Sequence, residues 1–125
     1  MEYQPGVCNI GPVERRKRLA LAVASLLAAV VLVAAVVSAD WPLWTLLFTL
    51  FPLYGAAMGA LQYRERFCVG FAGMGRFNVG DGTHDVTDPQ ALEVDRKRAV
   101  RLNTKALVAG AVGALAVYGG GLVVL

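Results

Sequence analysis

The stretch LALAVASLLAAVVLVAAVVSA, residues 19 to 39, contains no charged side chain. A helix rises about 1.5 Å per residue, so a run of about 20 apolar residues matches the ~30 Å hydrocarbon core of a bilayer. Two further runs, 41–61 and 106–125, are also uncharged and of similar length. The sequence therefore predicts an all-α integral membrane protein with three transmembrane helices, at 19–39, 41–62 and 104–125.

The composition indicates the same class, with the whole chain, 1–125, forming one membrane domain. Of the 125 residues, 57% are hydrophobic and 17% are charged. A soluble domain of this length needs more polar surface to cover its core. An alternative interpretation of the first run is an export signal cleaved after Val37-Ser38-Ala39. Signal peptides have apolar segments of roughly 7 to 15 residues, so we expect a permanent helix instead.

The basic residues predict the orientation of the three helices. All twelve lie before the first helix or between the second and third: Arg15, Arg16, Lys17, Arg18, Arg64, Arg66, Arg76, Arg96, Lys97, Arg98, Arg101 and Lys105. This positive-inside pattern predicts a multi-pass protein of the cell membrane with its N-terminus in the cytoplasm and its C-terminus outside. The positive charge is interpreted as a topology signal that also attracts anionic lipid headgroups, and no nucleic acid is expected as a partner.

Two parts of the chain are expected in the cytoplasm, a short arm over residues 1–11 and a longer segment over 63–103. In the longer segment, Asp88 and Pro89 predict a helix start, with Asp88 as the N-cap and Pro89 at the first helical position. We expect this helix to continue into the third span and its charged residues to lie on a solvated face.

The glycine-rich stretch 70–82 allows two interpretations. With Arg76 nearby it could bind an anion, but its spacing does not match a phosphate-binding loop and no strand precedes it. The favoured interpretation is a flexible loop whose phenylalanines, Phe67, Phe71 and Phe77, enter the membrane interface.

Two short segments resemble each other, CNIG at 8–11 and FNVG at 77–80. Asparagine and glycine both suit turns and helix entry. We interpret the likeness as shared helix-entry chemistry, with chance as the alternative.

Small residues at helical spacing predict close helix packing. Gly55 and Gly59 form a GxxxG match, and Ala106, Gly110 and Ala114 form a small-residue row. Such rows let helices approach closely, either inside one three-helix bundle or between this chain and another membrane protein.

Aromatic residues and a proline mark the second span. Trp41, Trp44 and Tyr63 are predicted to anchor the helix ends at the membrane interfaces. Pro52 removes one backbone hydrogen bond and is expected to kink the helix.

Catalytic and transport chemistry finds little support in the sequence. The spans contain no acidic, basic or histidine side chain, although pumps and carriers place such groups at membrane depth. We therefore expect neither an enzyme nor an autonomous transporter, and no cofactor or small-molecule substrate.

Cys8 and Cys68 are the only cysteines, and each lies at the predicted cytoplasmic end of a helix. One hypothesis is a thiol pair for redox or persulfide chemistry, with Arg15 or Arg66 favouring the thiolate. The other is two unreactive, partly buried cysteines.

His84 is the sole histidine and could complete a metal site only together with Cys8, Cys68 and Asp85. No local ligand spacing supports such a site, so a loop histidine and no metal are expected.

Residues 8–68 contain a set of short motifs: Asn9-Ile10-Gly11, Glu14-Arg15, Arg18, Phe51-Pro52-Leu53-Tyr54 and Cys68. With these motifs, this part of the chain resembles the YgaP-like transmembrane domain family. Phe51 stands where the family has a cysteine, Cys68 comes later than the family's second cysteine, and the third helix is additional. The resemblance implies a self-associating helical hairpin and a link to sulfur transfer at the membrane.

Taken together, these patterns predict a small non-enzymatic membrane protein that acts as a self-associating module or as an accessory subunit of a membrane complex. Its expected partners are the lipid bilayer and either a second copy of itself or another membrane protein. The alternative is a thiol or sulfur-handling protein that uses Cys8 and Cys68 on the cytoplasmic face.

Overall fold

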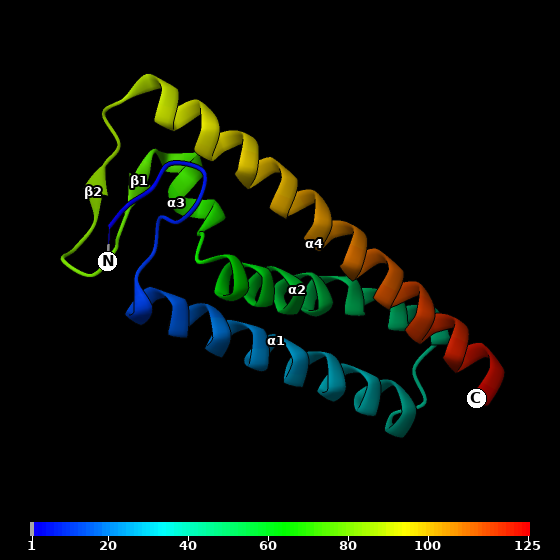
Figure 1. Cartoon of the computed structure of the whole chain (residues 1–125). Helices are drawn as coiled ribbons and strands as arrows, with labels where there is room; N and C mark the ends of the chain where they lie inside the picture. The colour runs from blue at the N-terminus through cyan, green and yellow to red at the C-terminus, as the bar shows by residue number, and fades with distance from the viewer. Residues whose placement is uncertain (1) are drawn as a thin grey trace.

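In the computed structural model, which describes residues 2–125, three long helical segments are joined at one end to a smaller region of short elements (Figure 1). The segments Pro12–Ser38, Leu43–Glu65 and Pro89–Val124 are long and apolar enough to cross a membrane. The predicted helical class with three such segments is therefore confirmed.

The first helix, α1 (Pro12–Ser38), starts earlier than the predicted span. Gly11 is its extended N-cap, and Pro12 occupies the first position, where a missing N–H costs nothing. Asp40 ends the helical region because it adopts a left-handed conformation with φ 56°. The basic cluster that precedes the apolar run thus forms the first turns of α1.

The second apolar run is divided into the 3₁₀ helix η1 (Leu43–Thr49) and the α-helix α2 (Leu50–Glu65). We expected Pro52 to kink a continuous helix. It lies instead in the first turn of α2, where a proline is compatible with helix geometry. The irregularity therefore precedes Pro52 and is a change of helix type.

The last helix, α4 (Pro89–Val124), is continuous from the charged segment into the third apolar run. The Asp88 side chain caps its start by accepting a hydrogen bond of 3.1 Å from the Gln90 N–H. This confirms the prediction that Asp88 is the N-cap, that Pro89 is the first helical residue and that the helix continues into the third span. The expected short helix is the first part of one long helix.

The three helical segments form one layer in which α2 packs against both α1 and α4. A Cβ atom at Gly59 would lie 2.7 Å from the Arg18 carbonyl oxygen and from the Ala22 nitrogen. A Cβ atom at Gly110 would lie 3.0 Å from the Tyr54 nitrogen. The backbones therefore approach so closely that only glycine fits at the tightest contact.

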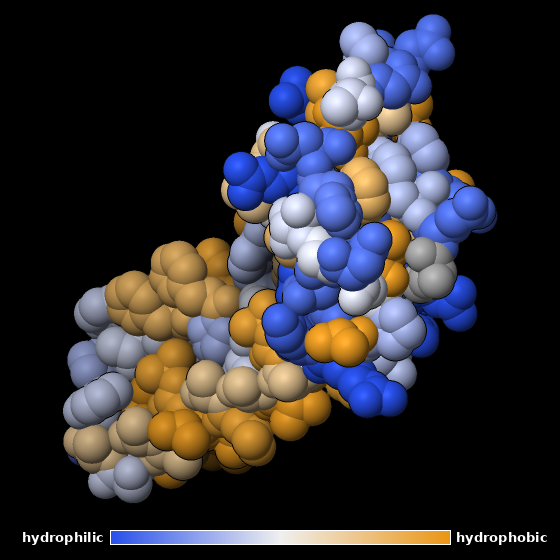
Figure 2. All heavy atoms as spheres, turned by 90° about the vertical axis from the view of Figure 1, so that its left-hand side faces the viewer, coloured by the Kyte–Doolittle hydropathy of each residue, from blue (hydrophilic) through white to orange (hydrophobic). Residues whose placement is uncertain are grey.

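The chain divides into an apolar layer and a polar head. The apolar layer consists of α1 from Leu19 onward, η1, α2 up to Tyr63 and α4 from Ala106 onward. The polar head consists of residues 2–18, 64–88 and α4 before Ala106. Figure 2 shows hydrophobic side chains gathered over one part and hydrophilic ones over the other. Many large apolar side chains of the layer are exposed, including Leu27, Val31, Phe51, Val112 and Leu115. A surface of this extent suits contact with lipid.

The segment between α2 and α4 differs from the flexible loop that the sequence predicted. It contains the short helix α3 (Val69–Met74) and two antiparallel strands, β1 (Arg76–Phe77) and β2 (His84–Asp85). Phe67 is fully buried in a cluster that also contains Ala72, Ala99 and Leu102. The prediction that this side chain enters the membrane interface is therefore wrong, because α4 extends beyond the apolar layer and offers it an apolar face.

Candidate functional site

The two similar segments of the sequence lie against each other in the polar head. The Asn78 N–H donates to the Asn9 carbonyl oxygen at 2.8 Å, and the Gly11 N–H donates to the Asn78 carbonyl oxygen at 2.8 Å. A Cβ atom at Gly11 would lie 2.5 Å from the Val79 carbonyl oxygen. The CNIG and FNVG segments therefore pair with each other through their backbones. This pairing joins the N-terminal arm to the strand region.

Asn9 also fixes the start of α3 through its side chain. Its Nδ2 donates to the Cys68 carbonyl oxygen at 3.0 Å, and its Oδ1 accepts from the Cys68 N–H at 2.6 Å. Asn9 is fully buried. These bonds satisfy the backbone N–H and carbonyl of Cys68. Leaving such buried polar groups without a partner would cost free energy. No local pattern in the sequence predicts this role, because Cys68 lies 59 positions from Asn9.

The sulfur atom of Cys68 lies among hydrogen-bond donors. Arg18 Nη2 is 3.0 Å from it, and the Phe71 N–H donates to it at 3.4 Å, so that Cys68 caps α3. Arg18 is itself paired with Glu14 at 3.3 Å. The cation beside this thiol is therefore Arg18, which the sequence did not suggest because it lies 50 positions away.

Cys8 has different surroundings. Its thiol donates to the Glu2 carbonyl oxygen at 3.4 Å, while the Cys68 sulfur bonds to Arg18. Both cysteines are free and buried, with 6% and 5% of their surfaces exposed. Arg15, one of the arginines expected beside a thiol, instead donates to the Tyr63 carbonyl oxygen at 2.6 Å. Among residues 2–125, no group bonds to both sulfur atoms.

Asp95 holds the N-terminal arm against α4. It accepts hydrogen bonds from the Tyr3 hydroxyl and, at 2.6 Å, from the Gly6 N–H, and only 1% of its surface is exposed. Burial and the bond to Asp95 raise the pKa of the Tyr3 hydroxyl above its ordinary value. The expectation that the charged residues of this helix face solvent is therefore wrong for Asp95, because the folded arm covers it.

Arg98 extends the same attachment. Its guanidinium donates to the carbonyl oxygens of Gly6 and Val7 and is 2.7 Å from Glu65 Oε2. One side chain thus connects the arm, the end of α2 and the start of α4.

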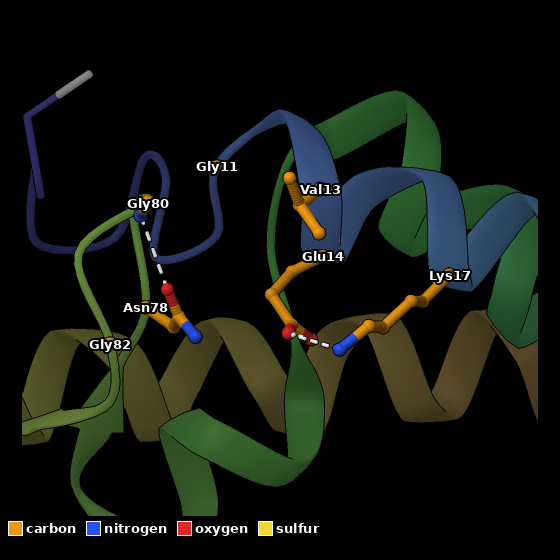
Figure 3. Close-up of a pocket in the computed structure, with 7 residues that line it drawn as sticks. All are labelled: Gly11, Val13, Glu14, Lys17, Asn78, Gly80 and Gly82. Atoms are coloured by element: carbon orange, nitrogen blue, oxygen red, sulfur yellow. Dashed lines mark hydrogen bonds and ion pairs between the residues drawn. The ribbon is translucent and has the colours of Figure 1, made fainter.

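The glycine-rich stretch borders a cavity of about 260 Å³ beside the start of α1 (Figure 3). Its polar side chains are already partnered. Glu14 binds Lys17 at 2.9 Å, and Asn78 Oδ1 accepts from the Gly80 N–H at 3.1 Å. Arg76 pairs with Asp85 at 3.4 Å across the two strands. The cavity thus offers an anion few uncommitted donors.

His84 contacts Asp81 and Phe77. Its Nε2 is 3.4 Å from Asp81 Oδ1, and its ring lies 5.6 Å from the Phe77 ring. Within residues 2–125, no three histidine, cysteine, aspartate or glutamate side chains lie close enough to hold a metal.

The residues predicted to pack helices lie at contacts inside the chain. Gly55 faces Ser25 of α1, Gly59 faces the α1 backbone and Gly110 faces α2. Ala106 and Ala114 are buried on the same helix as Gly110. Substituting these glycines therefore tests the fold of one chain before any contact between chains.

The predicted interfacial anchors are of two kinds. Trp41 lies just before η1 and Trp44 lies in η1, and their surfaces are 47% and 55% exposed. Tyr63 instead lies under the Arg15 guanidinium, 4.2 Å from its ring centroid.

A groove of about 360 Å³ lies between α3 and α4. Its lining is mostly apolar: Val69, Gly73, Ala99 and Val100, with Arg96 and Asn103. Val100 is 65% exposed, and the neighbouring Met74 of α3 is 60% exposed. A Cβ atom at Gly73 would contact nothing within 4 Å, so there is open space beside this residue of the groove.

No protein-family model matches this chain, and no curated protein or solved structure matches it significantly.

Proposed function

We propose that the protein is a small non-enzymatic protein of the cell membrane, with its N-terminus in the cytoplasm and its C-terminus outside, and that it is an accessory subunit of a membrane complex. The groove between α3 and α4 is the observation that carries this proposal. In the proposed topology this groove faces the cytoplasm, where large exposed apolar side chains mark protein interaction sites.

The proposed occupant is a segment of another membrane protein that carries apolar side chains and a carboxylate. Arg96 borders the groove, and among residues 2–125 its side chain has no ion-pair partner. A symmetric contact between two copies would bring the same basic border together from both sides, which is unfavourable. Charge complementarity therefore favours an acidic partner over self-association through this groove.

Filling the groove tests the proposal. Gly73→Leu adds a side chain where no atom lies within 4 Å, so the head should remain folded. We expect a membrane protein that co-purifies with the wild-type chain to be lost from Gly73→Leu and from Val100→Glu. Gly120→Leu is the matched control, because it also adds leucine at an open helical position.

Co-expression of two tagged copies of the chain distinguishes an accessory subunit from a self-associating module in the same experiment. If co-purification of every membrane protein is unchanged in Gly73→Leu and Val100→Glu, the groove is not the binding surface. If the copies instead retain each other and lose this association in Gly73→Leu, the module is self-associating.

A thiol role is a second candidate, favoured by the contact of 3.0 Å between Arg18 and the Cys68 sulfur. A positive charge beside a cysteine favours its thiolate. Under the proposed likeness to YgaP-like domains, Cys68 would be the cysteine that handles sulfur, without Cys8 as a partner.

The test is the rate at which iodoacetamide alkylates Cys68 in the folded Cys8→Ser protein. We expect the rate to fall in Arg18→Gln if the arginine activates the sulfur. A Cys68 that does not react in the folded protein, or that reacts equally in both proteins, would contradict this role.

A further inference from the structure

One side of the polar head carries a continuous basic groove. Two cavities, of about 450 Å³ and 220 Å³, share Glu65 and Arg98 as lining residues and therefore adjoin. We call this surface the basic groove; its charged lining residues are Glu2, Arg64, Glu65, Arg66, Arg98, Arg101 and Lys105. Five of these seven side chains are basic.

Most of the positive charge in the basic groove is unneutralised. Glu65 is taken by Arg98 at 2.7 Å. Within the described chain, the side chains of Arg64, Arg66, Arg101 and Lys105 have no ion-pair partner. Elsewhere, Lys17 and Lys97 pair with acidic residues one turn away. Among residues 2–125, four of the seven basic side chains without an ion-pair partner therefore lie on this surface; the other three are Arg15, Arg16 and Arg96.

The arrangement along α4 is unfavourable without a counter-ion. Arg101 and Lys105, which have no ion-pair partner among residues 2–125, are four positions apart and share one helix face with Arg98, which Glu65 neutralises. Like charges at this spacing destabilise a helix. An anion bound among them would remove that repulsion, and guanidinium groups bind phosphate oxygens in a bidentate manner.

The location of the basic groove indicates the source of the anion. Arg64 lies in the last turn of α2, and Lys105 directly precedes the apolar run of α4 that begins at Ala106. The basic groove therefore lies at the level where the apolar layer ends. If the layer lies in a bilayer, as proposed above, this is the depth of the lipid phosphates, and basic pockets at this depth bind anionic headgroups.

We propose that the basic groove binds the phosphate of an anionic phospholipid. This site is distinct from the apolar groove between α3 and α4, which has Arg96 as its basic residue. The proposal of a lipid site rests on the proposed membrane insertion but not on the proposed protein partner.

The experiment is native mass spectrometry of the detergent-purified full chain with phosphatidylglycerol, and separately with phosphatidylcholine. We expect preferential retention of phosphatidylglycerol. In Arg101→Gln/Lys105→Gln the affinity for phosphatidylglycerol should fall roughly thirtyfold, from about fivefold for each basic residue near a headgroup. Arg64 borders the same site from α2, so Arg64→Gln should also weaken the retention of phosphatidylglycerol.

The matched control is Arg16→Gln/Lys97→Gln, which removes the same charge from positions outside the basic groove and should retain the lipid. Equal loss in both double variants, or equal retention of the two lipids, would overturn the proposal. Displacement of phosphatidylglycerol by millimolar inorganic phosphate would also overturn it, since the site would then belong to a soluble anion. Gly73→Leu should bind phosphatidylglycerol normally, so failure of the partner proposal leaves this result unchanged.

Discussion

The apolar layer and the polar head are held together by different kinds of contact. In the layer, helices meet through glycine and alanine, and the Tyr54 hydroxyl of α2 bonds to Asn103 of α4, just before the layer begins on that helix. In the head, buried Asn9 and Asp95 bond to segments distant in sequence. The layer therefore depends on close backbone approach, whereas the head depends on satisfied buried polar groups.

The largest expected effect is on the layer. Gly59→Leu places a side chain against the α1 backbone, with Cβ 2.7 Å from Arg18 O and Ala22 N, so α1 and α2 must separate. We expect the free energy of unfolding to fall by about 3 kcal/mol, the upper range for overpacking. Unfolding by SDS, followed by circular dichroism, measures this change.

Gly120→Leu is the control for this substitution, because it adds the same side chain where nothing lies within 4 Å. Its unfolding should match that of the wild-type chain. If Gly59→Leu unfolds like Gly120→Leu, close approach of α1 and α2 does not hold the layer together.

A smaller effect is expected in the head. Asn9→Ala leaves the buried N–H and carbonyl of Cys68 without their side-chain partners. We expect a loss of about 2 kcal/mol, since an unsatisfied buried polar group costs this much. The loss should be local, so maleimide should label Cys68 faster while the far-ultraviolet circular dichroism stays unchanged.

Asn78→Ala is the control, because that side chain bonds only to the Gly80 N–H in an exposed loop. It should leave the labelling of Cys68 as in the wild-type chain. Equal labelling in the two variants would show that the side chain of Asn9 does not fix the start of α3.

The same difference explains what the sequence could predict. The three apolar runs and the start at Asp88-Pro89 are local patterns, so hydropathy and capping rules located the helices. The burial of Asp95 depends on an arm 89 positions away, and Arg18 reaches Cys68 across 50 positions. No periodicity along the chain encodes such contacts, so these residues of the head were not identified.

The Gly55 and Gly59 motif illustrates a different limit. Its spacing predicted close packing but not the surface against which the residues pack. The structure places both residues against α1, through Ser25 and the backbone near Ala22. Self-association must therefore be tested on other surfaces.

The smallest expected effect concerns the attachment of the arm. Tyr3→Phe removes one hydrogen bond to Asp95, for which we expect a loss of about 1 kcal/mol. Because the pKa of Tyr3 is raised in the folded chain, the neutral hydroxyl stabilises the fold. This contribution is fully present below the ordinary pKa of about 10 and is lost as the pH rises through the raised value. Amide exchange of the arm should therefore differ between wild type and Tyr3→Phe by a constant factor from pH 7 to about 9, and the two should converge at higher pH. A difference that already shrinks near pH 8 would show that the hydroxyl does not hold the arm through its neutral form.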